Sequence, residues 1–462
     1  MTPREAAITH RGETVMKGET MRRIHRRRLL QFSGIAAVAA AGGLAGMFAA
    51  GRAPAYAQGT SLHWLKFVDF VPPSDQLLKG RVAEECQKAL GIKLNIEAID
   101  GNSVQARITS AIQSGTGADI MMAISNWPQL YTDSVVAVDD IAEEIGKAHD
   151  GYYETARVCA NNGRKWIGVP WTIIPSVLVN RTSWFAEIGI NAENFPKTWD
   201  DYRAAGKKMK PKSRPFGQTL GHTYGDAPAF WYPYLWSWGG KEVEADGKTV
   251  VLNSKETVES VKYAAAFWKD CYDEGGFAWD DASNNRAFLS NTCSSTENGA
   301  SIYLLAKRKF EDYQSETGKP LKDDIFHMPL PAGAAGQFSY HVPFTNMVMG
   351  YSKNQKPATE FLRWIHTKEI FDPWYASQEG FSVGSTKMWA NHPLWKNDPV
   401  MLPYRTAVFS GRFAGYAGPS NRPAAEAISK YLIVDMYSKA AQGTAAEDAV
   451  KWAHGELTKI YA

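Results

Sequence analysis

The chain after residue 60 alternates short apolar runs with amphipathic stretches, and this order constrains the fold more than any other feature. Residues 61–68, 92–99 and 118–123 are continuously apolar or alternate between apolar and polar residues, which predicts three strands. Residues 75–90 and 103–114 carry apolar residues at helical spacing, and each stretch is followed by glycine, which predicts two helices. Strands and helices that alternate at this spacing predict an α/β fold with a parallel sheet.

A basic segment and then an apolar segment precede this alternation. Five arginines between residues 22 and 28 are followed by the uncharged stretch 33–50 and by Ala55-Tyr56-Ala57. Charged, apolar and cleavable parts in this order predict a secretory signal over residues 1–57, and residues 25–31 are similar to the twin-arginine (Tat) export motif. A membrane anchor is disfavoured because the stretch is short, rich in Gly and Ala and followed by a cleavage triplet. We therefore expect the mature protein in the periplasm.

Removal of this signal reverses the sign of the net charge. Residues 1–57 carry nine Lys or Arg and three Asp or Glu, so the remaining chain carries 42 basic and 45 acidic residues. A net charge of −3 gives no reason to expect nucleic-acid binding. The cysteines lack C-x-x-C spacing, which disfavours zinc and redox sites, and the sequence does not choose between free buried thiols and any disulfide pairing of Cys86, Cys159, Cys271 and Cys293.

Two loops of the predicted sheet are candidate ligand-binding segments. Ligands of open parallel sheets bind beyond the carboxyl ends of the strands, which here are followed by residues 67–73 and 125–128. Asn126 and Trp127 lie in the second loop. The indole ring of Trp127 is suited to stack on a ligand, and the alternative is that it packs beneath the loop.

Three motifs further along the chain occur together in one protein family. The first runs from Lys165-Trp-Ile-Gly-Val-Pro-Trp171 through Ser176-Val-Leu-Val-Asn-Arg181 to Phe195-Pro-Lys-Thr-Trp-Asp-Asp201. The second is Pro357-Ala-Thr-Glu-Phe-Leu-Arg-Trp-Ile365, and the third runs from Trp374 to Gly380. In this order the motifs resemble those of the family 1 extracellular solute-binding proteins of ABC importers, the maltose-binding-protein-like group, over about residues 60–460.

The resemblance implies a two-lobed α/β periplasmic binding protein with a hinge of crossover strands and a ligand cleft between the lobes. Ligand binding closes such a hinge, and a membrane permease recognises the closed form. A small-molecule ligand and an ABC permease are therefore the expected partners, with a monomer, no cofactor and no metal. Crossings are expected near 172–175, 338–342 and 380–385, with 58–172 and 342–380 forming lobe 1 and 173–341 and 381–462 forming lobe 2.

Local chemistry predicts two helix starts in the second lobe. Thr198 precedes Asp200 and Asp201, so its side chain is expected to cap a helix whose first turn is acidic. Ser254 is likewise expected to start the helix at 258–274. Both roles are structural.

Aromatic platforms and planar polar groups are the side chains that bind the faces and hydroxyls of sugars. The aromatic run 230–240 offers Trp231 and Trp236, although an aromatic stripe at helical spacing also suits a helix core. Asn298-Gly299 predicts a strand-to-helix turn whose free N–H groups suit ligand oxygens. The candidate ligand residues are Asn126, Trp127, Trp171, Trp231, Trp236, Glu297, Asn298, His341 and Trp374.

Three functions compete for this fold. The first is capture of a sugar, polyol or related small polar solute for an ABC transporter. The second keeps the fold but binds a polyamine, organic acid or other non-sugar solute, and Glu297 is the one acid expected in the cleft. The third is a secreted glycosidase, which needs two flanking carboxylates. The acid pairs Asp280-Asp281 and Asp323-Asp324 are expected to be solvated loop residues, and no hydrolase motif occurs, so an enzyme is not expected.

Overall fold

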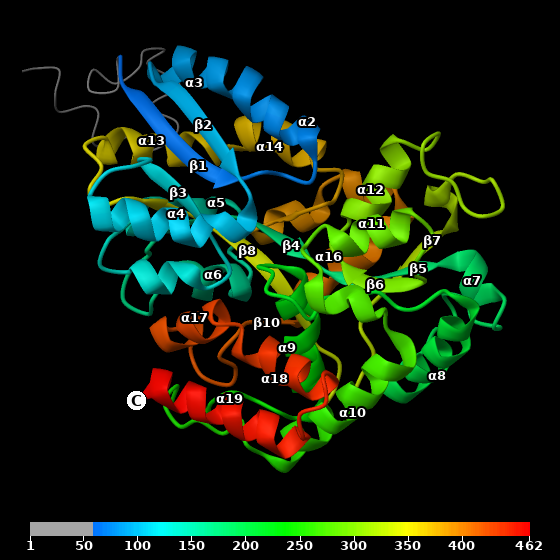
Figure 1. The fold of residues 1–462 in the computed structure, drawn as a ribbon. Coiled ribbons are helices and arrows are strands. Elements are labelled where there is room, and N and C mark those ends of the chain that lie inside the picture. Colours follow the sequence, from blue (N-terminus) through cyan, green and yellow to red (C-terminus); the bar gives the residue numbers. More distant parts are fainter. Residues whose placement is uncertain (1–58) are drawn as a thin grey trace, which may run out of the picture. The chain divides into compact units, whose positions relative to one another are not determined.

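The alternation that opens the described chain, residues 59–462, forms a parallel three-stranded unit in this computed structural model. The predicted export signal lies outside the described residues. Strand β1 pairs in parallel with β2 on one side and with β3 on the other, which confirms the predicted α/β order (Figure 1). The elements are β1 Ser61–Phe67, α2 Pro72–Leu77, η1 Leu78–Val82, α3 Ala83–Leu90, β2 Lys93–Ile99, α4 Gly101–Ser114 and β3 Ile120–Ile124.

Strands from later in the chain complete this sheet, and they run in both directions. β8 (Ser339–Val348) lies between β3 and β4 (Val169–Pro175) and runs antiparallel to both. The sheet order is β2-β1-β3-β8-β4-β9, so the sheet is mixed rather than parallel throughout. Trp64 Nε1 donates to Asn346 Oδ1 at 2.9 Å, which pairs two polar groups inside this buried layer.

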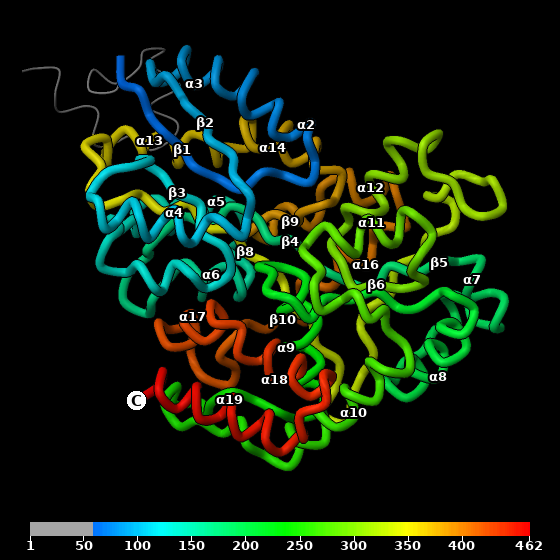
Figure 2. The backbone as a smooth tube through the Cα atoms, viewed as in Figure 1, coloured from blue at the N-terminus to red at the C-terminus, as the bar shows by residue number. Residues whose placement is uncertain are grey.

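The chain passes between its two sheets where three strands are neighbours. Ile174 of β4 pairs with Val342 of β8, and Thr172 of β4 pairs with Gly384 of β9 (Val383–Gly384). Residues from all three segments predicted to cross between lobes are therefore adjacent in one sheet, and Figure 2 shows β4, β8 and β9 together. We call these strands the hinge.

A smaller antiparallel sheet of order β6-β5-β7 forms the centre of a second lobe. The Thr198 side chain accepts the Asp201 N–H, and the Ser254 side chain accepts the Thr257 N–H, which confirms both predicted helix starts. The elements are β5 Val177–Arg181, α7 Thr182–Ala186, α8 Trp199–Met209, α9 Asp226–Trp238, α10 Lys255–Cys271, α11 Ser283–Leu289, β6 Ser295–Asn298, α12 Ser301–Arg308 and β7 Ile325–Met328. We call the elements around the first sheet lobe 1 and those around this sheet lobe 2.

The last three helices contact both lobes. Helices α18 (Leu432–Ala441) and α19 (Ala446–Tyr461) pack on α10, whereas α17 (Arg422–Ser429) packs on η2 (Trp127–Tyr131) of lobe 1. The lobe boundaries drawn from the sequence stay predictions. The remaining helical elements are α5 Asp139–Ala148, α6 Glu154–Ala160, η3 Lys210–Lys212, η4 Glu274–Ala278, η5 Leu321–Asp324, α13 Gln355–Ile365, α14 Lys368–Ser377, η6 Lys387–Asn391, α15 Leu394–Asn397, η7 Pro399–Met401, α16 Leu402–Ala407 and η8 Val408–Ser410, and β10 (Gly411–Arg412) pairs with β8.

All four cysteines lie within the described residues, and each is buried and free. Burial raises the pKa of the Cys86, Cys159 and Cys271 thiols to about 12, so these thiols are unreactive in the folded protein. No helix within residues 59–462 is both long enough and apolar enough to span a membrane.

Candidate functional site

A small cavity of about 30 Å³ lies where the two lobes meet the hinge. Lobe 1 contributes the loop after β1, and lobe 2 contributes the start of α9, the loop before α11 and the turn between β6 and α12. The cavity therefore lies in the position where a two-lobed fold is expected to hold its ligand. Its lining residues are Phe70, Ile174, Ser176, Tyr224, Gly225, Asp226, Asp281, Asn298, Gly299, Ser301, Val342 and Phe381.

Aromatic rings from both lobes form part of the cavity wall. Phe70 follows β1 and lies in the loop 67–73, one of the two loops predicted to bind ligand. Phe381 follows α14. Their ring centroids are 6.0 Å apart and the rings are tilted by 48°. Tyr224 lines the same cavity from the loop before α9 in lobe 2. The cavity thus offers aromatic surface from both lobes to a small ligand.

Asp281 binds the first backbone groups of helix α9. Its Oδ1 accepts the N–H of Gly225 at 3.1 Å and the N–H of Asp226 at 2.9 Å. These N–H groups have no partner within the helix, so a carboxylate there stabilises the helix start. The sequence prediction that Asp281 is solvated is wrong, because this capping role buries it, and burial raises its pKa to about 6.

Asp226, the first residue of α9, lines the cavity with an unsatisfied carboxyl group. The residue is 8% exposed, and its Oδ2 makes no well-formed hydrogen bond in the described part of the chain, although the Asn284 side chain is close enough to favour its charged form. Burial raises the pKa of Asp226 well above its usual value, and the charges of Asp281 and Glu297 raise it further. A buried polar atom without a partner is uncommon in native proteins and calls for an explanation.

Glu297 lies beside the cavity wall, in β6 next to Asn298. It is 1% exposed, and within residues 59–462 neither of its side-chain oxygens makes a well-formed hydrogen bond, although the side chains of Ser176 and Gln218 are close enough to favour its charged form. Burial raises the pKa of Glu297 well above its usual value, and the charge of Asp281 adds to this effect. The two unsatisfied carboxyl groups, of Asp226 and Glu297, therefore lie within electrostatic reach of each other.

The turn between β6 and α12 has the predicted strand-to-helix form. Asn298 ends β6 and lines the cavity, and Ser301 begins α12. The Asn298 side-chain amide donates to Asn285 Oδ1 and, at 3.2 Å, to Ser301 Oγ. These bonds fix the amide, so Asn298 presents a fixed polar group to the cavity.

Lobe 1 contacts lobe 2 directly beside the cavity. Asn102, near the start of α4, accepts the Tyr224 N–H at 3.0 Å and places its side-chain amide 3.4 Å from Asp281 Oδ2. A Cβ atom on Gly101 would lie only 2.3 Å from Cε1 of Tyr224. The close approach of the lobes at this point therefore requires glycine at position 101.

Two of the predicted ligand residues belong to the core of lobe 1. The rings of Trp171 and Trp374 have centroids 4.5 Å apart, and Trp171 also contacts Phe371 and Trp64 edge-on. Both tryptophans are buried, and among the described residues neither lines the cavity. The structure brings this pair together as hinge-side packing, and their contact with ligand stays a prediction.

Trp231 and Trp236 lie inside lobe 2. The Trp231 ring stacks on Tyr437, with centroids 4.8 Å apart, and its Nε1 donates to the carbonyl oxygen of Thr219 at 2.9 Å. The ring centroid of Trp236 lies 6.5 Å from that of Tyr340, a residue near the start of β8. Both are buried and neither belongs to the cavity lining of the described chain.

Asn126, Trp127 and His341 are buried near the contact between the lobes. Asn126 is 3.4 Å from the carbonyl oxygen of Ala414, and Trp127 begins η2. His341 Nε2 donates to the carbonyl oxygen of Ala407 at 2.8 Å, and burial lowers the pKa of His341 to about 4. Of the nine predicted residues, Asn298 is the one that lines the described cavity.

Sequence reasoning missed Asp226, Tyr224 and Phe381, and it misjudged Asp281. One signal was available for Asp226, because it precedes a run of 227–240 that contains no other charged residue. A single charge at the head of an apolar helix points to a specific partner. Nothing local distinguishes Phe381 from any other aromatic residue after a helix.

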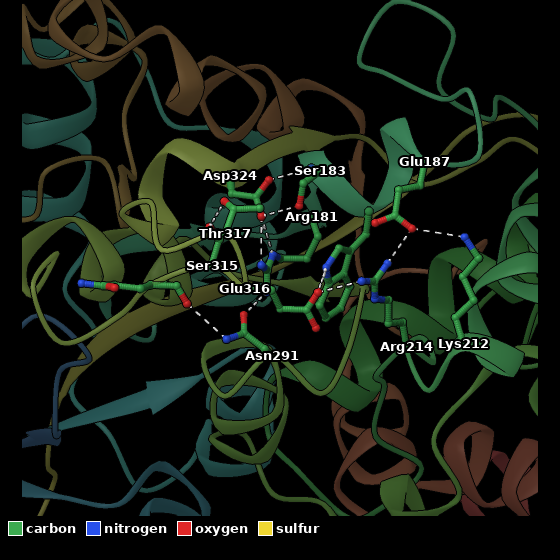
Figure 3. Close-up of polar contacts among 12 residues, drawn as sticks. Arg181, Ser183, Glu187, Lys212, Arg214, Asn291, Ser315, Glu316, Thr317 and Asp324 are labelled. Carbon is green, nitrogen blue, oxygen red and sulfur yellow. Dashed lines mark hydrogen bonds and ion pairs between the residues drawn. The ribbon is translucent and has the colours of Figure 1, made fainter.

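A second group of buried charges in lobe 2 is fully paired (Figure 3). The Arg181 guanidinium donates to Asp324 Oδ2 from two nitrogens, at 3.1 and 2.9 Å, and Nη1 binds Asn291 Oδ1. Asp324 also accepts the N–H of Ser183 at 2.6 Å and its hydroxyl at 2.8 Å. The prediction that Asp324 is a solvated loop residue is therefore wrong, since Arg181 and Ser183 hold it inside the lobe.

This paired network continues to the surface of lobe 2. Arg214 binds Glu187 at 2.8 Å and Glu316 at 2.7 Å, and the guanidinium groups of Arg181 and Arg214 lie over the ring of Trp184. Lys212 adds an exposed contact to Glu187 at 3.2 Å. We call these residues the Arg181 network. No group of three or more His, Cys, Asp or Glu residues in the described chain could hold a metal ion.

The two sheets, the hinge and the cavity between the lobes define a two-lobed α/β binding protein. Residues 81–403 match the model of the bacterial extracellular solute-binding protein family, so the chain belongs to this family. Relatives in Brucella abortus (strain 2308) and Brucella suis biovar 1 (strain 1330), each named as a binding protein, are 24% identical over 352 residues. The match covers 72% of this chain and 80% of each relative.

Solved structures of solute-binding proteins share the fold. A Thermotoga lettingae ABC transporter solute-binding protein with bound α-D-tagatose has a TM-score of 0.73 at 17% identity, and maltose-bound MalE3 of T. maritima has 0.72 at 17%. Both matches cover 87% of this chain and 100% of the other. A ribitol complex from Agrobacterium radiobacter K84 has a TM-score of 0.70 at 16% identity, covering 87% and 99%. At these identities the likeness concerns the fold.

Proposed function

We propose that the chain is the periplasmic substrate-binding component of an ABC transporter, capturing a sugar, polyol or related small polar solute and delivering it to the permease. The observation that carries the proposal is the cavity between the lobes, which combines aromatic rings with fixed polar groups. Membership of the extracellular solute-binding family supports the binding role and a location outside the cytoplasmic membrane. The tagatose, maltose and ribitol complexes support a polyhydroxylated solute.

Binding and lobe closure are linked in this proposal. Both lobes supply cavity residues, and the cavity of about 30 Å³ has room only for water-sized molecules, so a sugar-sized solute enters with the lobes further apart and contacts both of them as they close on it. The ligand then stabilises the closed arrangement by the difference between its affinities for the closed and open forms. Asn102 and Tyr224 add a hydrogen bond between the lobes in this arrangement. We propose binding without catalysis.

Calorimetric and thermal-unfolding titrations test the proposal on the segment 52–462, which forms a compact unit of its own. Sugars and polyols are added singly, and a ligand at 100 times its Kd should raise the free energy of unfolding by about 2.7 kcal/mol. Phe70→Ala should weaken binding because it removes a cavity wall, whereas Phe310→Ala, at an exposed site in lobe 2, is the matched control. A ligand response that Phe70→Ala leaves unchanged would place the solute elsewhere and overturn the proposal.

Delivery to a permease requires its own measurement. The purified protein is added to vesicles that contain the cognate transporter, and ATP hydrolysis is followed with and without ligand. We expect stimulation only by the liganded protein, since the closed form is the one recognised. Equal stimulation by the ligand-free protein would contradict this part of the proposal.

A further inference from the structure

We infer that the solute held between the lobes carries a protonated amine, which Asp226 binds together with the aromatic rings of the cavity wall. The inference rests on the solute-binding role in the proposed function and specifies the charge of the solute. Its shared chemistry is an alkylammonium group, carried either by an amino sugar or by an aliphatic polyamine.

The charged residue types around the cavity are all acids. Two of the twelve lining residues, Asp226 and Asp281, are acids, and none of these described residues is Lys, Arg or His. Glu297 adds a third buried acid whose charge reaches Asp226. A cation is attracted to such a site, whereas an anionic solute would be repelled by every ionised group near it.

The three acids differ in their hydrogen bonds, and this difference indicates different roles. Asp281 already accepts two N–H groups from the start of α9, so it has a structural role. Asp226 Oδ2 and both Glu297 oxygens are buried without a well-formed hydrogen bond in the described chain, and their polar neighbours Asn284, Ser176 and Gln218 bring no positive charge. Buried acceptors of this kind are expensive unless a donor reaches them, and an ammonium group brings three donors and a compensating charge.

The remaining cavity wall suits the same group. Phe70, Phe381 and Tyr224 bring three aromatic rings to a cavity that contains Asp226. The negative face of an aromatic ring attracts a cation, and the interaction strengthens where water is excluded. Carboxylate and aromatic rings together therefore favour an amine over a hydroxyl of the same size.

A neutral sugar is the competing occupant, because a protonated carboxyl group can donate to a hydroxyl. Proton release distinguishes the two. Burial raises the pKa of Asp226 well above its usual value, so its carboxyl group holds a proton more tightly than a free aspartate does. A bound ammonium group would lower that pKa and favour proton release into the buffer, whereas a bound hydroxyl would not. The ionisable groups that face this carboxyl are Asp280, Asp281, Glu297 and Tyr224.

The test uses matched amine and alcohol probes in calorimetric titrations of the segment 52–462. D-glucosamine is compared with D-glucose, and 1,4-diaminobutane with 1,4-butanediol, in two buffers of different ionisation enthalpy. We expect at least one amine to bind about tenfold or more tightly than its alcohol, the size of one charge-assisted hydrogen bond. That amine should also release protons. The pair that responds identifies the amino sugar or the polyamine as the source of the amine.

Two variants test whether the preference for amines depends on the Asp226 carboxyl group. Asp226→Asn keeps the shape and removes the charge, so it should weaken amine binding about tenfold while changing alcohol binding little. Asp312→Asn, at an exposed acid in lobe 2, is the matched control. The ligand-free melting temperature of Asp226→Asn should stay the same or rise, whereas a purely structural aspartate would lower it.

Amines that bind no better than their alcohols would overturn the inference. If neutral sugars or polyols still bind, the proposed function stands without it. If amines bind equally well to Asp226→Asn and to the unchanged protein, Asp226 is not their partner and the inference also fails.

Discussion

Asp324 and Asp226 are buried to nearly the same degree in lobe 2, at 7% and 8% exposed, but their surroundings are opposite. Asp324 accepts hydrogen bonds from Arg181 and Ser183 and belongs to the Arg181 network. Asp226 lines the cavity, and among the described residues its Oδ2 makes no well-formed hydrogen bond. In lobe 2, the buried acid that only stabilises the fold therefore has hydrogen-bond partners, whereas the buried acid at the cavity has an oxygen without a well-formed hydrogen bond.

The unsatisfied acids then have a physical interpretation. A buried ion pair is weakly stabilising overall, but removal of one member leaves a charge stranded in a low-dielectric interior. An unpaired buried acid already weakens the free protein, and ligand-binding sites commonly sacrifice stability in this way. The Arg181 network and the cavity acids should therefore respond to mutation with opposite signs.

The largest expected effect is in the Arg181 network. Asp324→Ala should lower the free energy of unfolding by about 3–5 kcal/mol, because it strands the buried Arg181 guanidinium. Urea unfolding of the segment 52–462 measures this change. Asp323→Ala, at the neighbouring exposed acid, is the control and should change little. A loss as small as that of the control would show that the network does not stabilise the lobe.

Beside the cavity we expect a mutation to raise the free energy of unfolding, which is opposite to the effect of Asp324→Ala. Glu297→Gln should raise the free energy of unfolding of the ligand-free protein at neutral pH, because burial disfavours the charged carboxylate and the neutral amide avoids that cost. The same urea experiment reports it, with Glu311→Gln at an exposed site as the control. Destabilisation by Glu297→Gln would mean that this acid supports the fold, and the contrast between the two regions would collapse.

The pH dependence sharpens the same contrast. The folded protein holds the Glu297 proton more tightly than the unfolded chain does, so the unfolded state binds fewer protons and stability falls as pH rises above the unfolded pKa. His327, His341 and His366 have pKa values lowered to about 4 and act oppositely, but only below about pH 6.5. Between about pH 7 and 8 the unchanged protein should therefore lose stability faster than Glu297→Gln, by at most about 1.4 kcal/mol per pH unit. If the stability of the unchanged protein and of Glu297→Gln fell equally with pH, the assignment of this pH dependence to Glu297 would be contradicted.

The smallest effect is expected at the exposed rim of the Arg181 network. Lys212 and Glu187 are each 45% exposed, and such surface pairs contribute little. Lys212→Ala should change the free energy of unfolding by less than about 0.5 kcal/mol. A larger loss would extend the stabilising network to the surface of the lobe.

The parts of the fold that the sequence predicts well depend on nearby residues. The three parallel strands follow from apolar periodicity, and the helix starts at Thr198 and Ser254 follow from side chains that reach N–H groups three residues away. The antiparallel insertion of β8 was not predicted, because its partners β3 and β4 lie far away in the chain.

The site was less predictable for the same reason. The turn at Asn298 was predicted correctly because turn chemistry is local, and the contact of Asn298 with ligand stays a prediction. A tryptophan on a helix has the same spacing whether it faces a cavity or a core, so Trp231 gave no signal of its packing against Tyr437. Asp281 and Asp324 each form part of an acid pair in the sequence, and only distant residues bury them.

The position of β8 also sets an order of events during synthesis. This strand lies in the middle of the lobe 1 sheet, but the ribosome makes it after β5, β6 and β7 of lobe 2. The nascent lobe 1 therefore exposes unpaired edges of β3 and β4 until most of the chain has emerged. Such long-range pairing slows folding and leaves strand edges open to association with other chains. A fragment that ends before Ser339 cannot complete this sheet.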